Sequence, residues 1–196
     1  MNTDSAIDVL IDQLRTYAED HPEEGRVVSA FFDLLTDWPA VLNRDVFPGH
    51  LTASAWIIAQ KNRSVLLLHH RKLDKWLQPG GHADGNTDLA GVALREVQEE
   101  VGLAGIMAEP GIFDIDVHEI PPFGDDPEHS HYDVRYLMVL PERVPLQKNH
   151  ESHDVKWQPL NSVNRLTTEE SISRMVSKSY PFLSSSFSPS SFVPTE

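Results

Sequence analysis

The segment from Gly80 to Leu103 constrains the fold of this chain more than any other. It reads GGHADGNTDLAGVALREVQEEVGL, in which a polar loop with paired glycines leads directly into an amphipathic pattern. Apolar residues recur at helical spacing from Leu89 to Val101, and Gly102 is typical of the residue that ends a helix. The segment therefore predicts a loop followed by a helix that packs one face against a sheet.

The polar face of this predicted helix carries three glutamates, Glu96, Glu99 and Glu100. At positions i, i+3 and i+4 their side chains share one face, roughly 5–6 Å apart, where like charges repel each other. Carboxylate oxygens bind Mg²⁺, commonly together with substrate phosphates, and a bound cation would remove the repulsion. Charge runs on helices are usually solvated surface, so the metal-site interpretation depends on the glycine loop and on the arginine that precedes the first glutamate.

Short apolar runs predict strands at residues 51–60, 64–70, 111–120, 131–140 and 154–160. Residues 61–63 predict a tight connection between the first two strands. Residues 167–178 predict a last helix, capped by Thr167 or Thr168. Strands mixed with a few helices indicate an α/β sandwich rather than a regular series of strand–helix–strand units.

Two appendages are predicted outside this region. Residues 1–48 hold two helical patterns separated by His21-Pro22, and we expect a small N-terminal helical extension that offers surface for packing or for a homodimer. Residues 49–178 hold the predicted α/β domain. Residues 179–196 are rich in serine and proline, which predicts a flexible tail.

Composition limits the partners and the compartment. The formal net charge of −14 argues against a nucleic-acid polymer or an anionic membrane as partner. A small phosphorylated substrate stays possible if divalent cations lie between the two sets of negative charge. The chain lacks cysteine, an apolar run near the roughly 20 residues of a membrane helix, and a signal-peptide start. We therefore expect a cytoplasmic protein without disulfides or thiolate metal sites.

The central segment resembles the Nudix box: glycine, five residues, glutamate, seven residues, Arg-Glu, an aliphatic residue, any residue, Glu-Glu, any residue, glycine and an aliphatic residue. Counted from Gly81, every position matches except Thr87, which stands where the family has glutamate. The matching positions are Arg95, Glu96, Val97, Glu99, Glu100, Gly102 and Leu103. The resemblance covers roughly residues 51–160 and implies the Nudix-type α/β/α sandwich with a mixed sheet.

The resemblance also implies a function. It implies a hydrolase that uses Mg²⁺ or Mn²⁺ to cleave a diphosphate linkage in a nucleoside diphosphate linked to another group, by water attack at phosphorus. The implied metal ligands are Glu96, Glu99, Glu100 and the carbonyl of Gly80. Arg95 becomes an orienting residue that has lost its usual partner at Thr87, which predicts either reduced order or a rerouted salt bridge, and not loss of activity.

Nudix enzymes differ in which glutamate acts as the general base. Glu99 and Glu100 are available on the helix. Glu151, in the polar loop KNHESHD shortly before Trp157, is the best candidate outside it, because several Nudix enzymes place a metal-associated or basic glutamate there. The alternative is that Glu151 is an ordinary loop carboxylate.

Several histidines and one arginine are candidate substrate contacts. His82 follows the glycine pair and is expected either to contact phosphate or to cap the loop. His69 and His70 end a strand, and because side chains alternate only one of them can face the site. The pattern from His129 to Arg135 predicts a polar strand face that lines the substrate cleft, with Arg135 as a phosphate contact. Its His-x-His has no third partner at zinc-like spacing in the sequence.

Two alternatives to the hydrolase come from other classes. A Nudix-fold module that binds a nucleotide without cleaving it is favoured only by Thr87, whereas the three intact glutamates favour the enzyme. An isomerase-type relative that acts on a prenyl diphosphate would need an active-site cysteine, and the chain has none.

Overall fold

The structure is a computed structural model that describes residues 3–122, 124, 127–184 and 187–190. The strands are β1 (Gly49–Ala59), β2 (Ser64–His70), β3 (Lys75–Leu77), β4 (Gly80–His82), β5 (Asp114–Ile120), β6 (His129–Leu140) and β7 (Ser152–Pro159). The α-helices are α1 (Thr3–Asp20), α2 (Gly25–Leu34), α3 (Leu89–Val101) and α4 (Glu170–Ser179). Short 3₁₀ helices lie at Pro22–Glu24, Leu35–Asp37, Ala40–Leu42, Leu160–Arg165 and Tyr180–Leu183.

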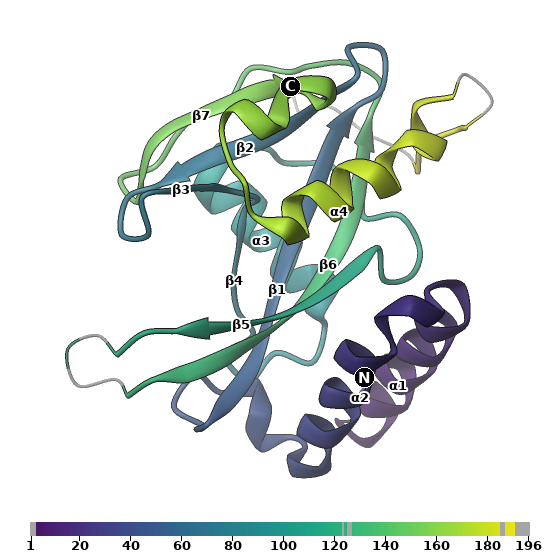
Figure 1. Cartoon of the computed structure of the whole chain (residues 1–196), viewed down its shortest axis with the longest axis vertical. Coiled ribbons are helices and arrows are strands. Elements are labelled where there is room, and N and C mark those ends of the chain that lie inside the picture. The colour runs from purple at the N-terminus through teal and green to yellow at the C-terminus, as the bar shows by residue number, and fades with distance from the viewer. Residues whose placement is uncertain (1–2, 123, 125–126, 185–186, 191–196) are drawn as a thin grey trace.

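The strands form one mixed sheet with a split in its middle. The order is β3-β2-β1-β6-β5, and β4 and β7 pair with β1 and β2. Strands β1 and β6 run parallel along the whole of β1, whereas the other pairs are antiparallel. Strand β1 pairs with β2 only at Ile58 and Ala59, and its earlier residues 52–54 pair with β4. The β2–β3–β7 half of the sheet therefore diverges from the half formed by β1, β4, β6 and β5, as Figure 1 shows.

Alternation along β1 supplies two separate cores. Ala53, Ala55 and Ile57 belong to a core that also contains the apolar face of α3, and all three are fully buried. Trp56 and Ile58 belong to a second core on the opposite face, together with apolar residues of α4. One face of the sheet is thus covered by α3 and the other by α4, which confirms the predicted α/β/α sandwich (Figure 1).

Helices α1 and α2 pack into the first core rather than standing apart from it. Leu14 and Phe31 have no exposed surface and belong to the same cluster as β1 and α3. Figure 1 shows the two helices beside the edge of the sheet that β5 forms. The predicted N-terminal helices are present, and the boundary at residue 48 stays a prediction. In the described residues, no helix combines the length and the apolar character needed to cross a bilayer.

The C-terminal end differs from the prediction in two ways. Helix α4 begins at Glu170, and its N-cap residue Glu169 has no side-chain cap, so Thr167 and Thr168 lie outside the helix. The hydroxyl of Thr167 instead accepts a hydrogen bond from the N–H of Glu169 at 3.3 Å. The start of the predicted tail folds into the 3₁₀ helix Tyr180–Leu183, because Leu183 is buried in the second core. Residues 185–186 and 191–196 of that tail lie outside the described residues.

Candidate active site

The glycine pair on β4 lies very close to its neighbours on β1 and α3. A Cβ atom at Gly80 would come within 2.4 Å of the Cβ of Ser54 on β1. A Cβ atom at Gly81 would come within 2.5 Å of a carboxylate oxygen of Glu96. The two glycines therefore let β4 lie against β1 on one side and let a glutamate of α3 lie against β4 on the other.

The predicted helix over residues 89–101 is α3, with the bounds that the sequence indicates. The side chain of Asp88 caps its start by accepting a hydrogen bond from the N–H of Gly91 at 2.9 Å. Gly102 ends it in a left-handed conformation with φ of 71°, which glycine adopts without strain. These two ends fix where the glutamates of α3 stand relative to β4.

Glu100 is the buried member of the glutamate set. Its side chain accepts a hydrogen bond from the N–H of Gly80 at 3.0 Å, and only 5% of the residue is exposed. Burial raises the pKa of Glu100 to about 8, and the charges of Glu96, Glu151 and Glu99 add to this rise against the opposing Gly80 hydrogen bond. The negative charge of Glu100 is therefore costly unless a positive charge offsets it.

Glu96 and Glu99 are held through Arg95. The guanidinium of Arg95 donates to Glu96 at 2.7 Å and to the carbonyl of His82 at 3.1 Å, and its Nε lies 4.0 Å from Glu99. The expected rerouting of the Arg95 salt bridge is thus seen, since these partners substitute for the glutamate that Thr87 replaces. The side chain of Glu99 is 61% exposed.

The three glutamates form an open set of oxygen donors. In the part of the chain that the structure describes, three donor atoms come within 4.8 Å of one another in two groups only, His50/His82/His131 and His21/Glu23/Glu24. The carboxylates of Glu96, Glu99 and Glu100 are spaced more widely, with Glu96 bound by Arg95 and Glu100 bound by the N–H of Gly80. A hard cation bound between them would draw the oxygens together.

Glu151 lies near this set. It is contributed by the loop before β7, and its carbonyl accepts a hydrogen bond from the N–H of Arg71 at 2.8 Å, which fixes the loop to the end of β2. Its charge acts on both Glu100 and His70. The structure therefore brings the loop carboxylate near enough to act electrostatically on Glu100.

The NUDIX domain family matches residues 48–179, which is more than half of the chain. This protein belongs to the Nudix family. A comparison with curated proteins finds no match.

Solved structures with this fold include three Nudix relatives of low sequence identity. A MutT protein from Methanosarcina mazei Go1 matches with a TM-score of 0.56 and 18% identity, over 68% of this chain and 96% of its own. The E. coli dihydroneopterin triphosphate pyrophosphohydrolase matches with a TM-score of 0.53 and 20% identity, over 65% and 92%. A C. elegans Ap4A hydrolase matches with a TM-score of 0.51 and 20% identity, over 68% and 96%. At these identities the likeness confirms the fold.

In this Nudix domain only one of the paired histidines of β2 lies beside the glutamate site. Burial lowers the pKa of His70, while the charge of Glu151 opposes this effect. His69 instead stacks on Trp76 with ring centroids 5.0 Å apart and contacts Asp74 at 2.8 Å. A bulge between the two histidines interrupts the pairing of β2 with β7.

Arg135 does not meet the expectation of a phosphate contact. Only 3% of its side chain is exposed, and its guanidinium donates to Asp133 at 2.8 Å and to Asp114 and Asp116 at 3.0 Å each. Helix α4 covers this network, because Arg174 also binds Asp114. The sequence alternation places Arg135 on the polar face of β6 as predicted, but the three aspartates occupy its donors.

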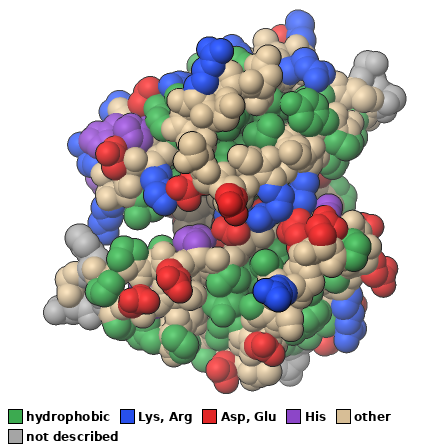
Figure 2. All heavy atoms as spheres, in the orientation of Figure 1, with side chains coloured by type: hydrophobic (Ala, Val, Ile, Leu, Met, Phe, Trp, Pro, Cys, Tyr) green, Lys and Arg blue, Asp and Glu red, His purple; other side chains and the backbone are tan. Residues whose placement is uncertain are grey.

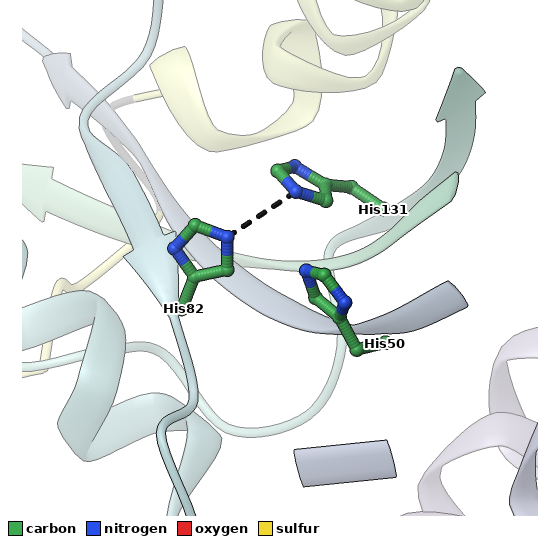
Figure 3. A group of neighbouring side chains, drawn as sticks. All are labelled: His50, His82 and His131. Carbon is green, nitrogen blue, oxygen red and sulfur yellow. Dashed lines mark hydrogen bonds between the residues drawn. The ribbon is translucent and has the colours of Figure 1, made fainter. Parts of the chain in front are cut away.

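The same polar face ends in a cluster of histidines that sequence reasoning missed. His50 of β1, His82 of β4 and His131 of β6 turn their rings towards one another, as Figure 3 shows. Burial first, and neighbouring charges second, lower the pKa of His82 to about 4 and that of His131 to about 2. Figure 2 shows a hollow across this face of the molecule, with histidine visible inside it. The only signal in the sequence was the His-x-His of β6, because its partners come from two distant strands.

Proposed function

We propose that this Nudix protein is a metal-dependent hydrolase that cleaves the diphosphate linkage of a nucleoside diphosphate joined to another group. The observation that carries the proposal is the contact of two α3 glutamates with the glycine strand. Glu100 accepts a hydrogen bond from the N–H of Gly80, and the carboxylate of Glu96 lies beside Gly81. Carboxylate oxygens of α3 therefore lie beside the backbone of β4. Such oxygen donors are the ligands that Mg²⁺ and Mn²⁺ favour.

The donor set fits a hard divalent cation. Glu96, Glu99, Glu100 and the carbonyl of Gly80 would hold it, and all four offer oxygen. The raised pKa of Glu100 supports this assignment, because its burial and its acidic neighbours disfavour a charge that a bound cation would stabilise. When bound, the cation neutralises the diphosphate and makes its phosphorus easier to attack.

The chain's own residues supply the proton chemistry and the positioning. In-line attack needs a group that accepts a proton from the attacking water. Glu99, Glu100 and Glu151 are the candidate bases, and Glu151, on a separate loop, acts electrostatically on Glu100. Arg95 orients Glu96 and Glu99 through the contacts described above. His70, whose pKa the charge of Glu151 affects, is proposed as a phosphate contact. The ring of His82 points instead towards His50 and His131, so His82 is not assigned to the phosphate.

Substrate class follows from charge and from the similar structures. A net charge of −14 favours a small anionic substrate only where cations lie between substrate and protein. Two of the similar structures carry names that state hydrolysis of a triphosphate and of Ap4A. Both names support a substrate with linked phosphates for this chain.

The proposal is tested by phosphate-release assays on a panel of nucleoside diphosphate derivatives, with Mg²⁺ and with Mn²⁺. We expect wild type to hydrolyse at least one member only when a cation is present. Glu99→Gln and Glu151→Gln should lower kcat by about 100-fold or more for whichever residue is the base, in line with the effect of removing a general base. Glu119→Gln, an exposed glutamate on β5, is the matched control.

Two outcomes would contradict the hydrolase. Wild type that binds a nucleotide but cleaves no member of the panel would assign the protein as a binding module. Hydrolysis that persists in excess chelator would exclude the cation from the reaction.

A further inference from the structure

The histidine cluster lies outside the carboxylate set and has the geometry of a metal site. One ring nitrogen from each of His50, His82 and His131 lies within 4.8 Å of the other two, and the ring centroids are 4.9–5.1 Å apart. Sheet pairing fixes this arrangement, because His50 stands opposite His131 in the β1–β6 ladder. His82 enters from the neighbouring β4 strand, where it stands opposite Thr52.

The spacing between the ring nitrogens of His82 and His131 matches that of two ligands on a tetrahedral ion. Two nitrogens at about 2.0–2.1 Å from Zn²⁺ and at the tetrahedral angle lie about 3.3 Å apart. Nε2 of His82 lies 3.3 Å from Nε2 of His131, and Nε2 of His129 lies 3.3 Å from the same atom. An imidazole nitrogen has a single in-plane position for a proton or a lone pair. Nε2 of His131 therefore cannot form a well-aligned hydrogen bond with both neighbours.

Backbone hydrogen bonds fix the tautomers of the His50 and His129 rings. A backbone carbonyl only accepts, so Nδ1 of His50 donates to Val46 at 3.1 Å and Nδ1 of His129 donates to Pro127 at 2.8 Å. In the neutral form of each ring, Nε2 therefore carries the lone pair. Nε2 of His50 is buried and has no hydrogen-bond partner among the described residues. Metal-binding histidines characteristically donate their second ring nitrogen to such a carbonyl.

We propose that His50, His82 and His131 bind one transition-metal ion of the zinc class, at a site separate from the glutamates of α3. Imidazole nitrogens select Zn²⁺ and similar ions over Mg²⁺, whereas carboxylates favour the harder cation. A water or an anionic substrate oxygen would complete the coordination of the ion at a fourth position.

Strand β4 connects this site to the glutamate site. His82 belongs to the same three-residue strand as Gly80 and Gly81, and its carbonyl accepts a hydrogen bond from Arg95. An ion held by His82 would tie β4 to β1 and β6. It would thereby fix the backbone against which Glu96 and Glu100 lie.

The test is metal binding by the full chain, measured apart from catalysis. Protein stripped with a chelator is titrated with Zn²⁺ in excess Mg²⁺, against a chromophoric competitor, and Co²⁺ is added in a parallel sample. We expect one Zn²⁺ per chain with a Kd below about 1 μM, the range of structural zinc sites. We also expect the intense visible absorption of four-coordinate Co²⁺. His82→Ala and His131→Ala should each weaken binding by more than about 100-fold, beyond the loss caused by an outer partner alone.

Controls separate this site from the two other groups of donors. His21→Ala, which removes the histidine of the His21/Glu23/Glu24 group, should leave Zn²⁺ binding unchanged. A Glu96→Gln, Glu99→Gln, Glu100→Gln triple variant should also retain Zn²⁺, although it should lose the hydrolysis assigned above, so the two proposals can fail independently. Thermal melts in chelator establish that each variant folds, and the half-buried His82 can also be replaced by Gln if the alanine variant does not.

The proposal is overturned if wild type takes up no Zn²⁺ at micromolar concentration. It is equally overturned if His21→Ala or the glutamate variant abolishes uptake while His82→Ala and His131→Ala retain it. The Co²⁺ spectrum of wild type gives an answer that does not depend on the folding of any variant.

Discussion

At the scale of single residues, Arg95 explains how the site is kept together without the usual glutamate. Thr87 replaces the partner that the Nudix box would supply, yet the guanidinium binds Glu96 and the carbonyl of His82. Asp88, the nearest acidic residue in sequence to Thr87, is used to cap α3 and not to bind Arg95. The arginine is therefore held from its own helix and from β4.

Arg95→Ala should lower kcat by about 10–100-fold, the usual effect of removing a partner that orients metal ligands. Its stability should change little, because 39% of the side chain is exposed. Thr87→Glu should raise kcat less than about 3-fold, since Arg95 already has partners. Steady-state assays and thermal melts check both variants, and a large gain in Thr87→Glu would show that Arg95 is poorly held.

At the scale of elements, α3 was predictable to the residue because its signals are local. The apolar repeat and Gly102 lie within one stretch of chain. The start of α4 differs from the prediction because Thr167 accepts a hydrogen bond from the N–H of Glu169, one residue before the helix. The side chain of Glu169 forms an ion pair with Lys75 of β3 at 2.9 Å. That second contact joins residues far apart in the sequence, which no local pattern reveals.

Asp88→Ala should lower the free energy of unfolding by about 1 kcal/mol, the usual cost of losing an N-cap. Asp88→Ser should restore most of this loss, because a hydroxyl can also accept the Gly91 N–H. Urea unfolding of the two variants gives the comparison. Equal losses in both would mean that the hydrogen bond to Gly91 contributes little.

The histidine cluster and the contacts of Arg135 could not be predicted from the sequence for the same reason, because both join residues of different strands. Alternation along β6 predicts which face His131 and Arg135 share, but not what lies opposite them. The parallel register with β1 brings His50 to His131, and the register with β5 brings Asp114 to Arg135. Both contacts depend on pairing between distant segments. The sequence therefore predicts the polar face of β6 but not the residues that this face meets.

At the scale of the whole molecule, a buried ionic network joins the N-terminal helices to the Nudix domain. Asp114 has no exposed surface and binds Arg135, Arg174 and Lys178 at 2.7–3.0 Å. Lys178 also binds Glu24, beside the start of α2, at 2.7 Å. Burial alone would raise the pKa of Asp114, but the hydrogen bonds from Arg174 and the surrounding cations hold it below its ordinary value.

Asp114→Asn should destabilise the protein by about 3–5 kcal/mol, because it leaves buried cations without their shared partner. Asp12→Asn is the matched control: Asp12 and Arg15 form an ion pair with side chains 75% and 68% exposed, so its loss should stay within about 0.5 kcal/mol. Thermal and urea unfolding measure both. Similar small losses would show that the network stabilises little.

Acid should unfold the protein through the same network. Burial would raise the pKa of Asp116, but the hydrogen bond with His118 and the charges of Arg135 and Arg174 lower it from 3.8 to about 2. The folded state thus binds fewer protons than the unfolded state in this range, so the stabilisation is complete above about pH 4 and is lost as pH falls through 2. Asp116→Asn should be less stable at pH 7 and should show a flatter dependence between pH 4 and 2. An unchanged slope in urea unfolding across that range would contradict this role.

The proposed hydrolysis depends above all on a cation bound by the glutamates of α3 beside Gly80 and Gly81 of β4. The most direct measurement is an electron paramagnetic resonance titration of Mn²⁺ into wild type and into the Glu96→Gln, Glu99→Gln, Glu100→Gln variant, each with and without methylene diphosphonate as an uncleavable diphosphate. We expect wild type to bind Mn²⁺ and to bind it more tightly when the diphosphonate is present, and we expect neither effect in the triple variant. Equal binding of Mn²⁺ by the two proteins would contradict this expectation.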